Sequence, residues 1–213
     1  MEPKRHRLEG AHKQKYTTHA TIKRHNALTK RQQQRIFVTD CEGPISKNDN
    51  AYELTSHYIP EGSKFYTLVS KYDDVLADVV KRKDYKAGDT LKLILPFLKA
   101  YAVTDQKMID FSAKDILLVA GATGTMQFVH KTMPSFIVST SYEHYLSVLC
   151  RAIGFPVENT YSTKVNLDKY PIKSEEKETL KKIAEEIIKM PTIEIPKNAK
   201  SLDDFSLEDQ ATI

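Results

Sequence analysis

The sequence lacks the features that mark several large classes of protein. It has two cysteines, Cys41 and Cys150, and neither a Cys-x-x-Cys pair nor zinc-ligand spacing, so it predicts no disulfide framework and no zinc site. No apolar run approaches the roughly 18 residues that a membrane-spanning helix needs. The basic N-terminus is not followed by the apolar segment of a secretory signal. We therefore expect a cytoplasmic protein without membrane insertion.

Positive charge is concentrated at the start of the chain. Residues 1–35 carry ten Lys and Arg against two Glu, a balance of +8, so the remainder of a chain with net charge +4 carries −4. This segment shows no sustained apolar period and is predicted to be a disordered arm. It is either a solvated leader, sequence from an upstream start, or a nucleic-acid-binding arm. We rank the nucleic-acid-binding role below the other two, because Tyr16 is the only aromatic residue in residues 1–35.

Apolar residues in the rest of the chain alternate between strand and helix patterns. Ile36–Thr39 and Ser135–Val138 predict buried parallel strands, and Val157–Val165 predicts a weaker third strand. Helical spacing separates them, and the segment between the first two strands reads as mostly helical. The helices are predicted near residues 65–80, 91–101, 105–113, 121–131, 142–153 and 174–190. This order predicts an α/β fold with a parallel sheet and a mostly helical insert.

The same patterns predict a division of the 213 residues into four parts. The predicted parts are a basic arm at 1–35, a sheet core at 36–49 and 116–190, a helical cap at 50–115 and a polar tail at 191–213.

Two carboxylates directly follow the first predicted strand. Asp40 and Glu42 are two residues apart, and alternate strand residues share a face, so both can face one cavity. Gly43 would let the backbone turn sharply after them. The pair is either a plain strand end or an acid pair that handles phosphate. In the second case one carboxylate attacks phosphorus, the other transfers protons, and Mg²⁺ with oxygen ligands supplies the positive charge.

Hydroxyl groups follow the second predicted strand, in the run Ser139-Thr140-Ser141. Because ligands of parallel sheets bind beyond the carboxyl ends of the strands, the Ser139 hydroxyl could reach the same phosphate as Asp40. The alternative is an ordinary helix N-cap, with Ser139, Thr140 or Ser141 as the capping residue.

The string VTDCEGPI, followed by a helical segment and then by FIVSTSYEHYL, resembles the haloacid dehalogenase (HAD) superfamily over roughly residues 36–190. It is most similar to the phosphoserine-phosphatase-like branch and to an archaeal group described with energy-converting hydrogenase A subunit R. The resemblance implies a HAD-like Rossmannoid sheet with a cap domain. It also implies Asp40 as nucleophile, Glu42 as acid and base, Mg²⁺ held by both, and Ser139 on a phosphoryl oxygen. Thr140 and Gly43 are the further phosphate-binding candidates.

The sequence departs from the superfamily pattern in its second half. The third motif is a lysine, for which Lys164 and Lys173 are candidates by position alone, each more typical of a surface lysine. The fourth motif, Gly-Asp-x-x-x-Asp, has no convincing counterpart, since Asp203-Asp204 follows no apolar strand and Asp209 lies almost at the end. We therefore expect only part of the core sheet, with an unpaired, apolar edge at the first strand.

Two functions follow from this pattern. The first is a HAD-type phosphohydrolase that acts on a small phosphorylated substrate through an aspartyl-phosphate, present here as a catalytically incomplete fragment. The second is a non-catalytic interaction subunit, for example of an energy-converting hydrogenase assembly. Both readings allow a second chain that completes the core sheet.

Overall fold

The computed structural model describes residues 35–213, and the predicted basic arm, apart from Arg35, lies outside the described residues. The strands are β1 (Phe37–Thr39), β2 (Ser135–Tyr142) and β3 (Thr160–Thr163). They form a parallel sheet in the order β1-β2-β3. The predicted α/β fold with a parallel sheet is confirmed.

The segment between β1 and β2 is helical, as predicted. It contains α2 (Asn50–Tyr58), α3 (Gly62–Asp74), the π-helix η1 (Val75–Val79), α4 (Thr90–Leu93), α5 (Leu95–Ala100) and α6 (Asp105–Lys114), and then α7 (Ala122–Thr132) leads into β2. No strand occurs within residues 50–115, all of which are described. The single helix predicted near Pro96 is divided at Ile94 into α4 and α5, because proline has no amide hydrogen and fits only the first turn of a helix.

The chain after β2 also follows the predicted order of elements. It contains α8 (Glu143–Ile153), the 3₁₀ turn η2 (Val157–Asn159), β3, the 3₁₀ turn η3 (Leu167–Lys169), α9 (Ser174–Lys189), the 3₁₀ turn η4 (Leu202–Asp204) and α10 (Leu207–Thr212). Gly154 ends α8 with φ +69°, the left-handed conformation expected of a C-terminal cap. β2 is longer than predicted, because it continues past Val138 to Tyr142.

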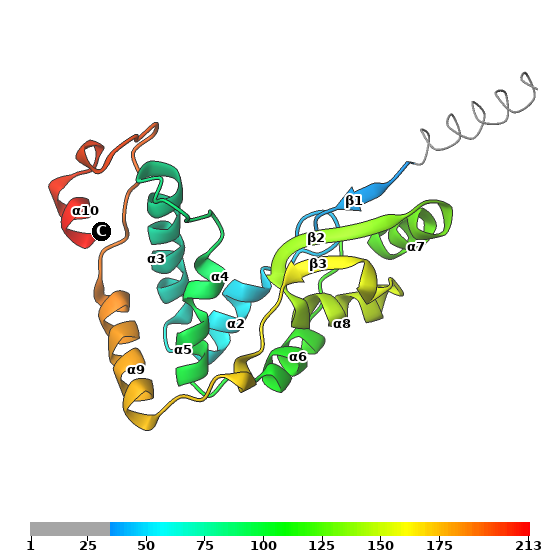
Figure 1. Cartoon of the computed structure of the whole chain (residues 1–213), viewed down its shortest axis with the longest axis horizontal. Helices are drawn as coiled ribbons and strands as arrows, with labels where there is room; N and C mark the ends of the chain where they lie inside the picture. Colours follow the sequence, from blue (N-terminus) through cyan, green and yellow to red (C-terminus); the bar gives the residue numbers. More distant parts are fainter. Residues whose placement is uncertain (1–34) are drawn as a thin grey trace, which may run out of the picture.

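Two large hydrophobic cores and a smaller third cluster hold the described part of the chain together. In the sheet core, Ile137 of β2 packs against Met126 of α7 and Leu149 of α8, and both helices lie on the same side of the sheet (Figure 1). The second core belongs to the insert and is centred on Phe65 and Leu98. In Figure 1 the insert helices α3, α4 and α5 form a group apart from the sheet.

Two of the predicted parts pack differently from expectation. The prediction places α9 with the sheet core, but its Ala184 and Ile188 belong to the insert core, and α9 lies beside α5 in Figure 1. The polar tail at 191–213, for which the sequence predicts no packing partner, has Ile193 and Phe205 buried against η1. The reason is that the few apolar residues of each segment match an apolar surface of the insert, which composition alone does not show.

The first two strands, which were predicted to be buried, are covered on one face only. Val38 of β1 is 58% exposed and Val138 of β2 is 47% exposed, whereas their neighbour Ile137 is 0% exposed. Successive residues point to opposite faces, so one face of the sheet is covered and the other is open. Within the described residues β1 pairs only with β2, so its other edge has no strand neighbour in this part of the chain. No helix in this part of the chain is long and apolar enough to span a bilayer.

Candidate functional site

Asp40 and Glu42 follow β1 at the carboxyl edge of the sheet. The Asp40 side chain is exposed and Glu42 is half-buried, while Cys41 between them is 0% exposed. This alternation turns the cysteine into the core and leaves both carboxylates outside it, as the two-residue spacing predicts. The amide of Cys41 donates to Oδ1 of Asp40 at 2.6 Å, which holds the carboxylate against the strand end.

Gly43 makes the turn that was predicted after the two acids. Its φ of +91° lies in the left-handed region, which glycine adopts without steric cost. Its amide donates to the carbonyl of Ser46 at 2.8 Å. In this conformation Gly43 shapes the turn, and its amide is already engaged, so its predicted contact with phosphate would require that hydrogen bond to open.

The two strand ends meet through Glu42 and Ser141. The Ser141 hydroxyl donates to Oε1 of Glu42 at 2.5 Å, across 99 residues of sequence. Ser139, the predicted phosphate ligand, lies two residues earlier in β2 and accepts a hydrogen bond from the Ser141 amide at 3.1 Å. Thr140 is exposed between them. The acid pair and the hydroxyl run therefore lie at the same edge of the sheet.

The alternative role of the hydroxyl run, as a helix cap, is wrong. The N-cap of α8 is Tyr142, with no side-chain hydrogen bond to the helix. Ser139, Thr140 and Ser141 all lie within β2 instead, because the strand continues four residues beyond its predicted end. Sequence reasoning did not predict the contact of Ser141 with Glu42. The two-residue spacing of Ser139 and Ser141 would be a signal in a regular strand, but β2 is irregular between Val138 and Tyr142.

Burial raises the pKa of the Glu42 carboxyl above its ordinary value. The Ser141 hydrogen bond works in the opposite direction, and the charges of Asp49, Asp40 and Glu53 raise the pKa further. A carboxyl group with a raised pKa keeps its proton to higher pH, which is the state that a general acid needs.

This raised pKa predicts a pH-dependent difference in stability between the wild type and Glu42→Gln. A carboxyl whose pKa is raised on folding contributes stability below its unfolded value, near 4.5, and that contribution is lost as pH rises through the folded pKa. The glutamine side chain of the variant does not titrate, so it makes no pH-dependent contribution of this kind. We expect the free energy of unfolding of Glu42→Gln, relative to wild type, to be greater at neutral pH than below pH 4.5.

Denaturant unfolding of both proteins across this pH range measures the difference. The control is Glu178→Gln on the surface of α9, where Lys181 lowers the pKa of the carboxyl, so the sign of the pH dependence is opposite. A relative stability of Glu42→Gln that does not change with pH would contradict the prediction.

The insert places side chains and a loop above this edge. Tyr66 of α3 lies near enough for the charges of Asp49 and Glu42 to raise the pKa of its phenol, after the larger effect of burial. A Cβ atom added to Gly88 would lie 3.9 Å from the Thr140 methyl group. The loop between η1 and α4 therefore approaches the hydroxyl run of β2, where it can contact a bound molecule.

A buried carboxylate holds this loop in place. Asp73 of α3 is 2% exposed and accepts hydrogen bonds from the Tyr85 hydroxyl, the Gly88 amide and the Thr90 hydroxyl. These three groups satisfy a charge that would be costly to bury alone. Asp73 was not singled out from the sequence, because its partners are 12 to 17 residues away.

Asn48 joins the insert to the sheet and was also missed by sequence reasoning. Its side-chain amide donates to the Asp115 carbonyl at 3.0 Å, and its Oδ1 accepts from the Leu117 amide at 2.8 Å. The Tyr145 hydroxyl of α8 also donates to Oδ1. The insert begins just after Asn48 and ends near Asp115. The Asn48 side chain therefore connects the segment that enters the insert to the segment that leaves it.

Of the remaining candidates, Lys164 directly follows β3 at the carboxyl edge of the sheet, whereas Lys173, Asp204 and Asp209 lie in later segments of the chain. Lys164 and Lys173 are exposed, and Lys173 precedes α9, away from the sheet. Asp204 accepts hydrogen bonds from the backbone amides of Lys200 and Ser201. Asp209 accepts hydrogen bonds from the Glu194 amide and the Ser206 hydroxyl. Within residues 35–213, no three His, Cys, Asp or Glu side chains converge as a metal site would require.

The two cysteines are buried and free. Burial raises the pKa of Cys41, next to Glu42 and Asp40, and raises the pKa of Cys150 to about 11. Burial disfavours the ionised form of both thiols. Cys41 is therefore a core residue between two acids.

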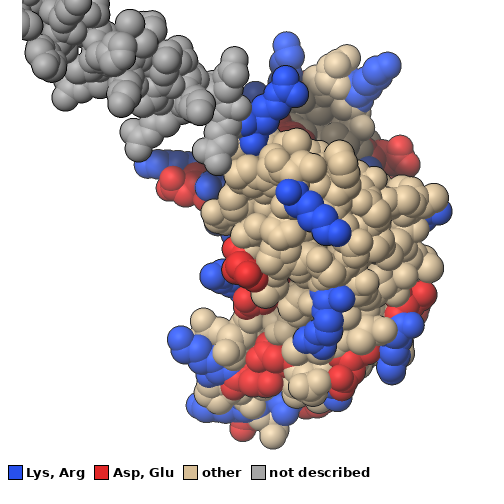
Figure 2. All heavy atoms as spheres, turned by 90° about the vertical axis from the view of Figure 1, so that its right-hand side faces the viewer, with Lys and Arg blue, Asp and Glu red and all other residues tan. Residues whose placement is uncertain are grey.

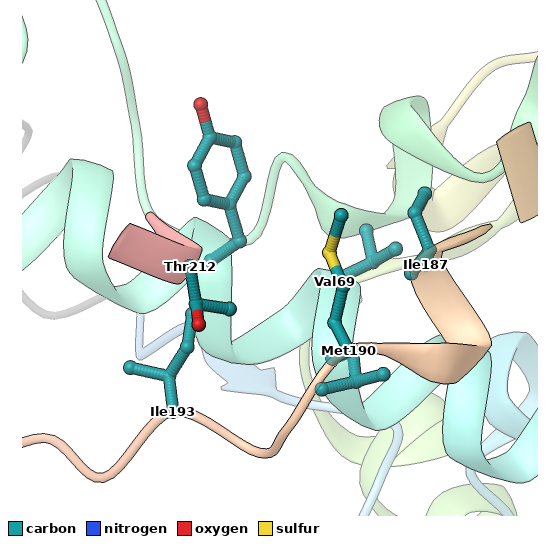
Figure 3. A pocket seen from close by; sticks show the side chains of 7 residues that line it. Val69, Ile187, Met190, Ile193 and Thr212 are labelled. Carbon is teal, nitrogen blue, oxygen red and sulfur yellow. The ribbon is translucent and has the colours of Figure 1, made fainter. Parts of the chain in front are cut away.

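Several cavities in the described part of the chain lie away from the acid pair. One, of about 210 Å³, is apolar and is formed by α3, α9 and the C-terminal segment. Figure 3 shows Val69, Ile187 and Met190 on one side of it and Ile193 and Thr212 on the other. Its lining has no carboxylate, lysine or histidine that could transfer a proton.

The second cavity, of about 520 Å³, lies between α6, α8 and β3 and contains an Asp105–His144 pair. Nε2 of His144 lies 3.0 Å from Oδ1 of Asp105. Asp105 also accepts from the amides of Leu167 and Asp168. Burial opposes ionisation of this carboxyl, but the two amides and His144 outweigh it and lower its pKa. The pair fastens the segment after β3 to α6 and α8.

Comparison with known proteins finds a similarity to a solved archaeal structure. No family of known proteins matches the sequence, and no curated protein matches it. Among solved structures, the chain resembles that of gene product AF1437 from Archaeoglobus fulgidus, with a TM-score of 0.70 and 31% sequence identity over 75% of this chain. The match covers 50% of the archaeal protein, so the chain spans about half the length of that relative.

Proposed function

We propose that this chain carries the nucleophile side of a HAD-type phosphohydrolase site. The observation that supports the proposal is the hydrogen bond between Ser141 and Glu42. It joins the end of β2 to the turn after β1, two residues from the exposed Asp40. In a parallel sheet this edge is where ligands bind. The resemblance of the motifs at residues 38–45 and 136–146 to the superfamily supports the same assignment.

In the first step, a carboxylate oxygen of Asp40 attacks the phosphorus of a phosphate monoester. A P–O bond to Asp40 forms, and the P–O bond to the leaving group breaks. Glu42, whose raised pKa favours the protonated form, gives its proton to the leaving oxygen. Ser139 and Thr140 are the candidates for hydrogen bonds to the phosphoryl oxygens.

In the second step, the Glu42 carboxylate takes a proton from a water molecule that attacks the aspartyl-phosphate. The bond between phosphorus and Asp40 breaks, and inorganic phosphate is released with Glu42 protonated again. Ser141 remains hydrogen-bonded to Glu42 and holds the carboxyl at the strand end through both steps.

The superfamily resemblance implies Mg²⁺, with Asp40 and Glu42 as its ligands. Bound there, the ion would supply Lewis-acid stabilisation of the phosphoryl oxygens. The described side chains do not by themselves fit such a site. No three metal-ligating side chains converge within residues 35–213, and Glu42 is engaged by Ser141. For this reason we expect catalysis by the chain alone to be weak.

The second candidate function is a non-catalytic interaction subunit. The observation that favours it is the open face of the sheet, where apolar side chains of two neighbouring strands are exposed. In this case Asp40 and Glu42 have a structural role only, and the function of the chain is to bind another protein. An assembly such as an energy-converting hydrogenase is the example that the sequence resemblance suggests.

Covalent trapping separates the two functions. The full chain is incubated with radiolabelled nitrophenyl phosphate and Mg²⁺, quenched in acid, and digested to locate the label. We expect the label on the peptide that contains Asp40, no label in Asp40→Asn, and normal labelling of the control Asp203→Asn, whose side chain is exposed in η4. An unlabelled wild type, or equal labelling of Asp40→Asn, would overturn the phosphohydrolase proposal.

A further inference from the structure

A third cavity lies between the insert and the segment that follows β3. Its volume is about 510 Å³, within the range of roughly 300 to 1,000 Å³ that is typical of small-molecule sites. One wall is formed by α4 and α5 and the other by residues 164–172, which pass between α5 and α6 on the way to α9 (Figure 1). Most of the lining is apolar, and its charged residues are Lys92, Lys99 and Lys164. We call this cavity the lysine groove.

The helical wall of the groove has an apolar stripe with a lysine at each end. Leu95 and Pro96 lie between Lys92 and Lys99, and spacings of three and four residues place all of them on one side of α4 and α5. Because a helix rises 1.5 Å per residue, the two lysines are about 10 Å apart along the axis. A ligand that fits this wall has an apolar body beside the stripe and a negative charge next to a lysine.

Contacts with β2 fix the end of the groove that lies nearest the sheet. The Thr163 hydroxyl donates to the Thr140 carbonyl at 2.6 Å, and the next residue, Lys164, begins the second wall. The loop that precedes Lys92 approaches the same residue of β2, because a Cβ atom on Gly88 would lie 3.9 Å from the Thr140 methyl group. Lys92 and Lys164 therefore lie at the same end of the groove, where both can contact one anionic group.

The groove is basic, and its positive charge is not balanced within its lining. Lys92 pairs with Asp89 at 2.5 Å and Lys99 lies 3.5 Å from Asp168, but among the described residues no carboxylate lines the cavity. Lys164 makes no salt bridge within residues 35–213. On the face seen in Figure 2, by contrast, Lys and Arg are scattered among uncharged and acidic residues. Three lysines around one apolar cavity favour an anionic ligand.

The second wall has few backbone groups left to pair with a peptide. Five of its amides already donate hydrogen bonds within the molecule, namely those of Val165, Leu167, Asp168, Lys169 and Tyr170. Pro96 on the facing helix has no amide hydrogen. A peptide bound in the groove would leave its own backbone groups without partners, which is costly in an apolar cavity. A hydrocarbon body has no such groups and avoids this cost.

We propose that the lysine groove binds a small amphipathic anion, namely a carboxylate with an aliphatic tail. The carboxylate lies between Lys92 and Lys164, where charge-assisted hydrogen bonds hold it. The tail lies along Leu95 and covers Ile172 and the ring of Tyr170, which is 65% exposed. Burial of the tail and of these side chains supplies the favourable free energy of binding.

Titration calorimetry of the full chain with decanoate, below its micelle concentration, tests the proposal. We expect binding at a single site and no binding of acetate, which lacks the tail. Decyltrimethylammonium, which reverses the charge of the head, should bind about tenfold more weakly or not at all. Lys164→Glu should weaken decanoate binding about tenfold, because it removes a positive partner and adds a like charge. The control Lys131→Glu, an exposed lysine in the last turn of α7, should leave the affinity unchanged.

NMR of ring-labelled tyrosine locates the ligand without any variant. Decanoate should shift the resonance of Tyr170 and leave that of Tyr161, a tyrosine of β3 that is similarly exposed at 62% but does not line the groove. Absence of binding would overturn the proposal. So would equal affinity for the two amphiphiles, equal binding by Lys164→Glu, or a shift confined to Tyr161. Decanoate contains no phosphate, so these outcomes are independent of the proposed function.

Discussion

A Glu42→Gln variant is expected to transfer phosphoryl groups from alkyl phosphates about 10² to 10⁴-fold more slowly than the wild type. An alkoxide is a poor leaving group and needs a proton in the transition state, and glutamine cannot donate one. Glu42 is suited to this role because burial raises the pKa of its carboxyl, while Ser141 fixes the position of the group. Single-turnover quench experiments with the full chain measure this rate.

The same variant should behave differently with nitrophenyl phosphate. Its leaving group is stable as an anion, so transfer to Asp40 should be slowed much less. Loss of the base for water activation should then let the labelled aspartyl-phosphate accumulate above the wild-type level. The matched control is Glu53→Gln, a nearby carboxyl whose pKa is also raised by burial but whose oxygens bind Asn48. Equal loss with both substrates, or the same loss in Glu53→Gln, would contradict the role of Glu42.

Replacing Phe65 by Ala is expected to lower the free energy of unfolding by about 3 to 5 kcal/mol. Phe65 of α3 is 0% exposed, and its ring packs edge-on against Phe97 of α5 with centroids 4.8 Å apart. Removing the ring leaves a cavity in the insert core and forfeits its apolar burial. The loss is a large part of the roughly 5 to 15 kcal/mol by which domains are usually stable.

Urea unfolding followed by circular dichroism measures this effect. The control is Phe128→Ala, because Phe128 lies on α7 with 64% of its surface exposed and should change stability by less than about 0.5 kcal/mol. A loss below about 1 kcal/mol for Phe65→Ala would show that the insert does not depend on this core.

The positions of the secondary structure elements could be predicted because they depend on local patterns. The apolar run before Asp40, the helical spacing of the insert and the Gly154 cap are all properties of neighbouring residues. The extent of β2 could not be predicted in this way. Ser139, Thr140 and Ser141 are common at helix starts, and they stay in the strand because Tyr142 is buried and its hydroxyl donates to the carbonyl of Leu91 in the insert.

The sequence by itself determined that an α/β sheet carries two acids at one strand end and hydroxyl groups after the next, because strand patterns, turn residues and chain order are local. Only the tertiary structure decided that Ser141 is the hydroxyl that bonds Glu42, that α9 packs on the insert, and that one face of the sheet is open. Each of these depends on contacts between residues far apart in the chain, which are fixed by packing and by the satisfaction of buried polar groups rather than by local pattern.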